Sequence, residues 1–164
     1  RNYGVLKRLG STPLGRGRWL AAKVATVATI EVGQVAVLAM VGAALGWRPP
    51  PTWPLGLVAL ALGTAAFAGI GLALAGRLPA LANLAATNSL YLVLLLIGGM
   101  VVPIDKFPAP LAAVAHALPA APLAGLTVTT MGPESFATGW LWGVLAGWAI
   151  IAPLVAARTF RWDG

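Results

Sequence analysis

Residues 55–75 read LGLVALALGTAAFAGIGLALA and contain no charged side chain. A helix needs about 20 apolar residues to cross a hydrocarbon core roughly 30 Å thick, so this stretch alone is long enough to span a membrane. The rest of the chain has the same character, because 59% of its 164 residues are hydrophobic and 9% are charged, whereas a soluble domain has about 25% charged residues. The sequence therefore predicts an all-α integral membrane protein.

Three further stretches are long and apolar enough to be spans, at residues 24–46, 80–102 and 136–157. Residues 103–130 are also apolar, but they contain Pro110, Pro119 and Pro122. An interior proline removes a helical hydrogen bond and clashes with the preceding turn, and broken backbone at membrane depth occurs only where protein covers it or where it lines a wet cavity. We therefore expect one transmembrane domain over residues 1–164, with four spans and a short re-entrant helix pair at residues 103–130.

Positive charge gathers at the start of the chain. Six of the eleven Lys and Arg residues lie within residues 1–23, namely Arg1, Lys7, Arg8, Arg16, Arg18 and Lys23. Four spans would place Arg77, Arg158 and Arg161 on the same side as this segment, and Arg48 and Lys106 on the other. Because cytoplasmic loops are enriched in Lys and Arg, we expect residues 1–23 and the tail at 158–164 to be cytoplasmic, and residues 103–130 to be external.

The same charges bear on partners and localisation. The net charge of +7 comes without the interleaved aromatic residues of a nucleic-acid platform, so we expect contact with anionic lipid headgroups of the bilayer and no nucleic acid. The heavy use of Ala, Gly, Pro and Arg is typical of a GC-rich bacterial genome. We therefore expect a multi-pass protein of the bacterial plasma (inner) membrane.

Residues that carry chemistry are few. The sequence has one histidine, His116, no cysteine and no G-x-x-x-x-G-K-[ST] phosphate loop, and it shows no clustered set of acids, bases or metal ligands. We expect no catalytic site, no metal and no cofactor bound by this chain.

Glu31 is the most informative single residue, with Gln34 three positions further on. At 1.5 Å per residue, Glu31 lies about 12 Å beyond Lys23 and well inside the hydrocarbon region. An ionised side chain there costs on the order of 3 kcal/mol, so it should face other helices or water. Two roles stay open for it: a polar point on a translocation path or a proton-linked site, and a structural tie between helices.

Two roles stay open for the remaining polar residues, and the small residues of the last span predict helix packing. Asn83 and Asn88 lie near the start of the third span, with Thr87 and Ser89, and they either hydrogen-bond between helices or contact a substrate. In the last span a glycine recurs every fourth residue, at Gly139, Gly143 and Gly147. Small residues at this spacing let helices approach closely, which predicts tight packing against a partner that the sequence does not identify.

Two motifs and the chain end resemble the type-2 ABC exporter permease family. Residues 4–14 read GVLKRLGSTPL and are similar to the family pattern Gly-x-Leu-x-Arg-Leu-x-x-Thr-Pro-Leu, with matches at Gly4, Leu6, Arg8, Leu9, Thr12, Pro13 and Leu14. A second likeness lies in the proline-rich region, at Gly98, Gly99, Pro103, Pro108, Pro119 and Pro122. The closing Phe160, Arg161 and Trp162 are similar to the family's basic and aromatic ending.

The resemblance implies that residues 4–18 form a coupling helix. In such a permease this segment docks in a groove of a cytoplasmic ABC ATPase, with an apolar patch that includes Leu6 and Leu9 beside the charges of Lys7 and Arg8. ATP and Mg would be bound by that partner, and a second permease copy or a homologous permease would complete the path. The late proline-rich region would form external re-entrant helices between the last two spans.

The resemblance also implies what the chain lacks. Family members usually have six spans, with an amphipathic helix and two spans before the cytoplasmic segment, so we expect this chain to be the C-terminal portion of a permease whose natural beginning is not Arg1. Two other functions stay open, a non-transporting scaffold or regulatory subunit and a secondary transporter with Glu31 as its coupling residue. A mostly apolar lining favours a hydrophobic or amphipathic cargo.

Overall fold

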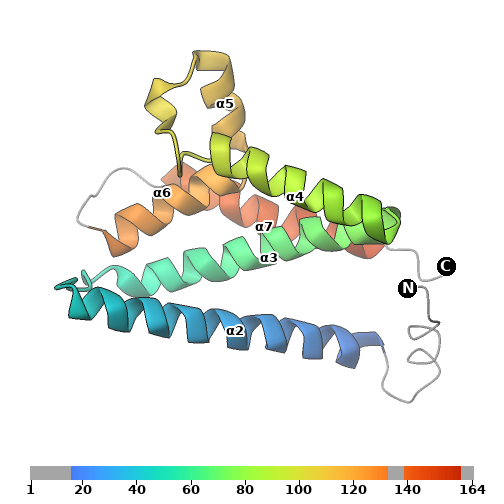
Figure 1. Cartoon of the computed structure of the whole chain (residues 1–164), viewed down its shortest axis with the longest axis horizontal. Coiled ribbons are helices and arrows are strands. Elements are labelled where there is room, and N and C mark those ends of the chain that lie inside the picture. Colours follow the sequence, from blue (N-terminus) through green and yellow to red (C-terminus); the bar gives the residue numbers. More distant parts are fainter. Residues whose placement is uncertain (1–15, 133–138, 160–164) are drawn as a thin grey trace. The chain divides into compact units, whose positions relative to one another are not determined.

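Every regular element in the described part of the chain is a helix. The computed structural model describes residues 16–132 and 139–159, and the chain divides into two compact units, Arg1–Arg48 and Pro49–Gly164. The first unit contains α2 (Arg16–Ala44). The second contains α3 (Trp53–Arg77), α4 (Ala80–Ile97), the short 3-10 helix η1 (Ile104–Lys106), α5 (Ala109–Ala117), α6 (Ala120–Met131) and α7 (Gly139–Thr159) (Figure 1).

Four of the described helices are long and apolar enough to cross a membrane. They are Ala25–Ala44, Trp53–Arg77, Ala80–Ile97 and Gly139–Arg158. Each coincides with one of the four stretches predicted from the sequence, and the all-α membrane fold is confirmed. The reason is physical, since a long apolar run satisfies its backbone hydrogen bonds within one helix and needs no water to do so.

Most helix bounds differ by a few residues from those predicted, and two of these differences are informative. The third span ends at Ile97 rather than at residue 102, because the chain turns at Gly98 and Gly99, and Gly99 has a φ of +79°, a backbone conformation that glycine adopts without steric cost. The helix of the first span, α2, begins at Arg16, which is before the predicted start at residue 24. Residues 16–23 are therefore the first turns of the same helix as the span, and not part of a separate coupling helix that reaches residue 18.

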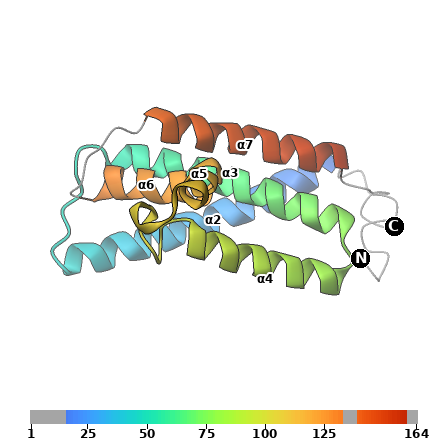
Figure 2. The same cartoon turned by 90° about the horizontal axis from the view of Figure 1, so that it is seen from above.

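Within the second unit, α3 and α7 pack side by side and run in the same direction (Figures 1 and 2). The buried face of α3 consists of small residues, at Gly56, Ala59, Gly63, Ala66, Gly69 and Gly76. Gly56 and Gly63 lie against α6, and Gly69 lies against α7. A Cβ atom built on Gly69 would lie 2.4 Å from the backbone nitrogen of Pro153. The two backbones therefore approach as closely as glycine allows, as is usual where small residues meet in membrane helices.

The short helix α6 completes the core. Ala59 of α3, Leu126 of α6, and Leu141 and Leu145 of α7 are buried together, and Leu126 and Leu145 are fully enclosed. The proline-rich segment that the sequence predicts as re-entrant therefore supplies part of the core of this unit.

Among the described residues, nothing packs against the glycine repeat of the last span. A Cβ atom built on Gly139, Gly143 or Gly147 would meet no described atom within 4 Å. The close helix approach that the sequence predicts for α7 is real, but the glycines that permit it belong to α3. The ends of the helices agree with the four-span scheme, since α3 and α7 finish at the same end of the unit, with Arg77 and Arg158 in their last turns (Figure 1).

Candidate functional site

The most distinctive feature of the second unit is the bent helix pair α5 and α6. The two helices meet at an angle of 79° across a break of a few residues, and with 9 and 12 residues neither is long enough to span a membrane alone. The sequence prediction of two short helices broken near Pro119 is confirmed. That the pair is external and re-entrant stays a prediction.

The prolines start these helices instead of interrupting them. Pro108 is the N-cap of α5 and Pro119 that of α6, and Pro110 and Pro122 lie in the first turns. The first N–H groups of a helix have no partner inside the helix, so a residue that lacks an N–H is tolerated there. The proline spacing therefore sets both the position of the break and the beginning of α6.

The break exposes a carbonyl that α7 satisfies. Because the helix does not continue past Ala117, the carbonyl oxygen of this residue has no N–H group of a following turn to accept from. The indole Nε1 of Trp148 donates a hydrogen bond to it over 2.8 Å. The residue before Ala117, His116, packs its ring edge-on against Trp140, with ring centroids 4.8 Å apart and an interplanar angle of 87°. α7 thus holds the end of α5 at two points.

The start of α6 rests directly on the end of α4. A Cβ atom built on Gly98 would lie 2.8 Å from the Cβ atom of Ala120, and one on Gly99 would lie 2.9 Å from the side chain of Ile104. Both glycines therefore allow an approach that a larger residue would prevent. Gly98 and Gly99, which are among the residues that carry the family resemblance, lie at the junction between the third span and the bent pair.

The far end of α6 is tied to the beginning of α3. The Thr52 hydroxyl donates a hydrogen bond to the carbonyl oxygen of Thr130 over 3.1 Å, and this carbonyl is one of those that a helix end leaves without an internal partner. A Cβ atom on Gly56 would lie 2.5 Å from the Met131 side chain. Both ends of α6 are therefore fixed, its start against α4 and its end against α3.

The threonines of α6 keep their hydroxyl groups satisfied without leaving the helix. Each donates to the carbonyl four residues earlier, over 2.8 Å from Thr127, 2.9 Å from Thr129 and 2.6 Å from Thr130. A hydroxyl without a hydrogen bond is costly in an apolar environment, so these bonds let α6 be buried among spans.

The polar residues predicted as site candidates are divided between the two units. Glu31 is half-buried and Gln34 is exposed, both on α2 in the first unit. On α4, Asn83 is half-buried whereas Asn88 is exposed, and the side-chain oxygen Oδ1 of Asn83 is buried with no hydrogen-bond partner among the described residues. The coupling residues that the sequence predicts from Gly4 to Leu14 lie outside the described residues.

Three features of the site were not predicted from the sequence. Trp148 is visible in the sequence as the one tryptophan in mid-span, but its partner is a backbone carbonyl that no sequence pattern marks. Thr52 is the N-cap residue of α3, but its hydroxyl donates a hydrogen bond to α6 and not to its own helix. Its place before a span does not indicate this partner. The seven-residue spacing of Gly56 and Gly63 is the signal that could have indicated the packed face of α3.

The site is built from helix packing and from hydrogen bonds to backbone carbonyls. In the described part of the chain, no group of three or more His, Cys, Asp or Glu residues lies close enough to hold a metal ion. What the site provides is a short buried helix, fixed at both ends and set at an angle between two spans. This arrangement defines a multi-pass, all-helical membrane protein with a bent helix pair between its third and fourth spans.

Comparison with protein families identifies the family of this chain. Residues 1–131 match the family model described as ABC-2 type transporter, a match that covers most of the chain and ends at the last residue of α6. The chain belongs to this family, and the resemblance seen in the sequence is confirmed. It is thus a membrane permease component of an ABC transporter, a class that generally has no catalytic site of its own and that assembles with an ATPase partner. Comparisons with curated proteins and with solved structures find no match.

Proposed function

We propose that the chain is the permease subunit of an ATP-driven exporter, in which it forms the translocation path for a hydrophobic or amphipathic cargo. The observation that supports this most is the extent of the family match, which includes the basic N-terminal segment, three of the four spans and the bent pair. ATP and Mg are bound by a separate cytoplasmic ATPase, and this chain binds no cofactor.

The segment that receives the energy input is the one that resembles a coupling helix, with Arg8 and Leu9 at its centre. The fold supports this role, because α2 is one continuous helix from Arg16 to Ala44. A helix rises 1.5 Å per residue and transmits displacement along its axis. Movement of the ATPase against the basic segment would therefore reach the span that carries Glu31 and Gln34.

The assembly that follows from this role has two permease copies, or one copy with a homologous partner, and two ATPase subunits. It lies in the bacterial plasma membrane, with both ends of the chain on the cytoplasmic side, because that orientation places the basic segment, Arg77 and Arg158 in the cytoplasm. Cargo that enters from the bilayer is consistent with the apolar character of the spans.

The decisive experiment uses the full protein together with its ATPase. Arg8→Glu and Leu9→Ala change the charged and the apolar part of the coupling segment, and Arg48→Gln, placed on the opposite side by the four-span scheme, is the control. We expect ATPase co-purification and ATPase stimulation to fall severalfold in the first two variants and to be unchanged in the third.

Two outcomes would contradict the proposal. Retained binding and normal stimulation in Arg8→Glu and Leu9→Ala would exclude the coupling role. Normal ATPase binding without cargo movement in reconstituted vesicles, tested across cargo classes, would favour a scaffold or regulatory subunit.

A further inference from the structure

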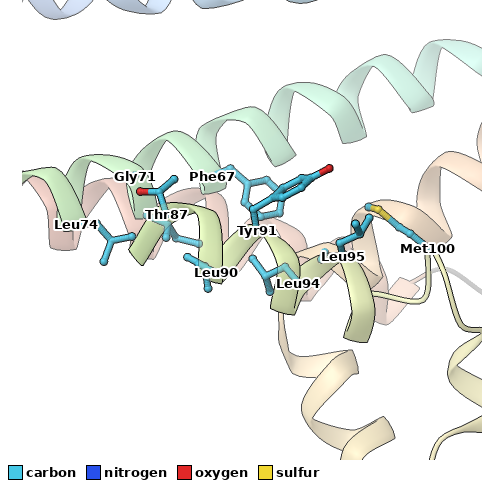
Figure 3. A pocket seen from close by; sticks show the side chains of 11 residues that line it. Phe67, Gly71, Leu74, Thr87, Leu90, Tyr91, Leu94, Leu95 and Met100 are labelled. Atoms are coloured by element: carbon cyan, nitrogen blue, oxygen red, sulfur yellow. The ribbon is translucent and has the colours of Figure 1, made fainter. Parts of the chain in front are cut away.

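An apolar groove separates α3 from α4 on the side of α3 that faces away from α7. Its volume is about 350 Å³, which is near the lower limit for small-molecule sites. It is lined by Phe67, Ile70, Gly71 and Leu74 of α3, by Thr87, Leu90, Tyr91, Leu94 and Leu95 of α4, and by Met100 and Ala120 (Figure 3). Among these lining residues only Thr87 and Tyr91 carry a polar side-chain group.

The groove is short and has two different ends. From Thr87 to Leu95 it extends about 12 Å along α4, at 1.5 Å per residue, which is less than half of the roughly 30 Å hydrocarbon core. At one end Met100 and Ala120 close it, where α6 begins. The other end points toward the turn between α3 and α4. Thr87 lies about 10 Å and Leu95 about 22 Å beyond Ala80, the first residue of α4, so the groove extends from the half of the span near this turn past its middle.

Polar groups stand at the end near that turn. Asn83 lies one helical turn before Thr87 and on the same face of α4, and its Oδ1 atom is buried without a hydrogen-bond partner among the described residues. Arg77 lies one turn beyond Leu74 on α3 and is exposed. An anion would be attracted to Arg77.

We propose that this groove binds one acyl chain of an anionic phospholipid from the leaflet on the Arg77 side. The chain lies along Phe67, Leu74 and Leu90, and the phosphate lies at Arg77. The site does not depend on a transport role, because it uses only the shape and the polarity of α3 and α4.

The dimensions favour a lipid over a further helix. A helix about 10 Å across would occupy on the order of 900 Å³ over the same 12 Å, which is more than twice the volume of the groove, whereas an extended hydrocarbon chain is far thinner. A partner helix would also need to continue through both leaflets. The charge at the interface end matches a phospholipid headgroup, since anionic headgroups are attracted to basic residues at this level.

The test places the purified full chain in vesicles that contain a photoactivatable phosphatidylglycerol with a diazirine in its acyl chain. A phosphatidylcholine probe with the same chain serves as the zwitterionic comparison, and inorganic phosphate is added in excess to detect a site for free anions. Labelled positions are identified by mass spectrometry. We expect labelling by phosphatidylglycerol to concentrate on α3 and α4, to exceed that by phosphatidylcholine and to persist in phosphate.

Matched variants separate the groove from lipid that surrounds any span. Gly71→Leu fills the groove at a position where a Cβ meets nothing within 4 Å, and Gly143→Leu makes the same change at an equally open position on α7. We expect labelling of α3 and α4 to fall severalfold in Gly71→Leu and to be unchanged in Gly143→Leu. Arg77→Gln should reduce the preference for phosphatidylglycerol about fivefold, the effect expected of one basic residue near an anionic headgroup.

Several outcomes would overturn the proposal. Equal labelling of α3 and α4 in the wild type and in Gly71→Leu would mean that no chain enters the groove. Equal labelling by the two probes in the wild type, or loss of labelling in phosphate, would exclude an anionic lipid. Labelling of the exposed face of α7 with none on α3 and α4 would mean that another helix covers the groove. Gel filtration of each variant shows whether it folds, and Arg77→Gln tests the site without altering its packing.

Discussion

Trp148 donates a hydrogen bond from its indole nitrogen to the carbonyl oxygen of Ala117, over a distance of 2.8 Å. Ala117 ends α5 at the 79° bend and Trp148 lies in the middle of α7, so the bond joins the bend to the last span. A tryptophan buried in a membrane usually finds a partner for its N–H group. Here the partner is the carbonyl that the bend leaves free, so one bond satisfies two polar groups.

Removing this bond should destabilise the bent pair. Trp148→Phe keeps an aromatic ring but leaves the Ala117 carbonyl without its donor, and we expect a loss of about 1 kcal/mol in the free energy of unfolding. Thermal unfolding of the purified protein in detergent measures it. Trp140→Phe is the control, since it removes the same indole group while a ring still packs against His116. A loss as large in the control would mean that ring size, and not the hydrogen bond, matters.

The close approach of α3 and α7 predicts a sharp contrast between two neighbouring glycines. A Cβ at Gly69 would lie 2.4 Å from the backbone nitrogen of Pro153, whereas one at Gly71 meets nothing within 4 Å. Gly69→Ala should therefore force the helices apart and cost about 1–3 kcal/mol, and Gly71→Ala should be neutral or slightly stabilising, since Ala favours helix over Gly. Both are compared by thermal unfolding in the same detergent. Equal stability of the two variants would contradict the packing of Gly69 on Pro153.

The spans could be predicted from the sequence, whereas their partners could not. Residues 55–75 must cross the membrane because they carry no charge over the necessary length, and the other three spans are as long and contain a single charged residue, Glu31. A lipid-exposed span, however, is apolar on every side, so no polar face shows which side is buried. Only small residues hint at the contact, and they occur on both α3 and α7. The sequence pattern favours Gly139, Gly143 and Gly147, but the structure uses Gly56, Gly63 and Gly69.

The candidate site was predictable to a similar extent. The prolines between residues 103 and 130 predict a break and two short helices, because a proline without an N–H group belongs in a first turn. Nothing in the sequence shows that Trp148 reaches Ala117 or that Thr52 reaches Thr130, because residues 31 and 78 positions apart meet only in the folded chain. The groove between α3 and α4 is also a product of the fold, since Gly71 and Leu90 lie on different spans.

The tie between Thr52 and Thr130 can be tested with a pair of substitutions. Thr52→Val removes the hydroxyl that donates to the Thr130 carbonyl over 3.1 Å, and Thr52→Ser retains it. We expect the valine variant to lose about 1 kcal/mol of stability and to expose the end of α6 to limited proteolysis, while the serine variant resembles the wild type. If both variants were cleaved at the wild-type rate, the hydroxyl would not hold α6 in place.

Glu31 offers the most direct test of the proposed path. Glu31→Gln keeps the size of the side chain and removes its charge, and it lowers the cost of placing this position in the hydrocarbon region, which is on the order of 3 kcal/mol for an ionised group. We therefore expect normal expression and assembly with the ATPase, but severalfold slower cargo movement in reconstituted vesicles, because the charge that lines the path is lost. Gln34→Leu, at an exposed position on the same helix, shows how far polarity without charge contributes. Unchanged transport in Glu31→Gln at normal expression would leave Glu31 only a structural role between helices.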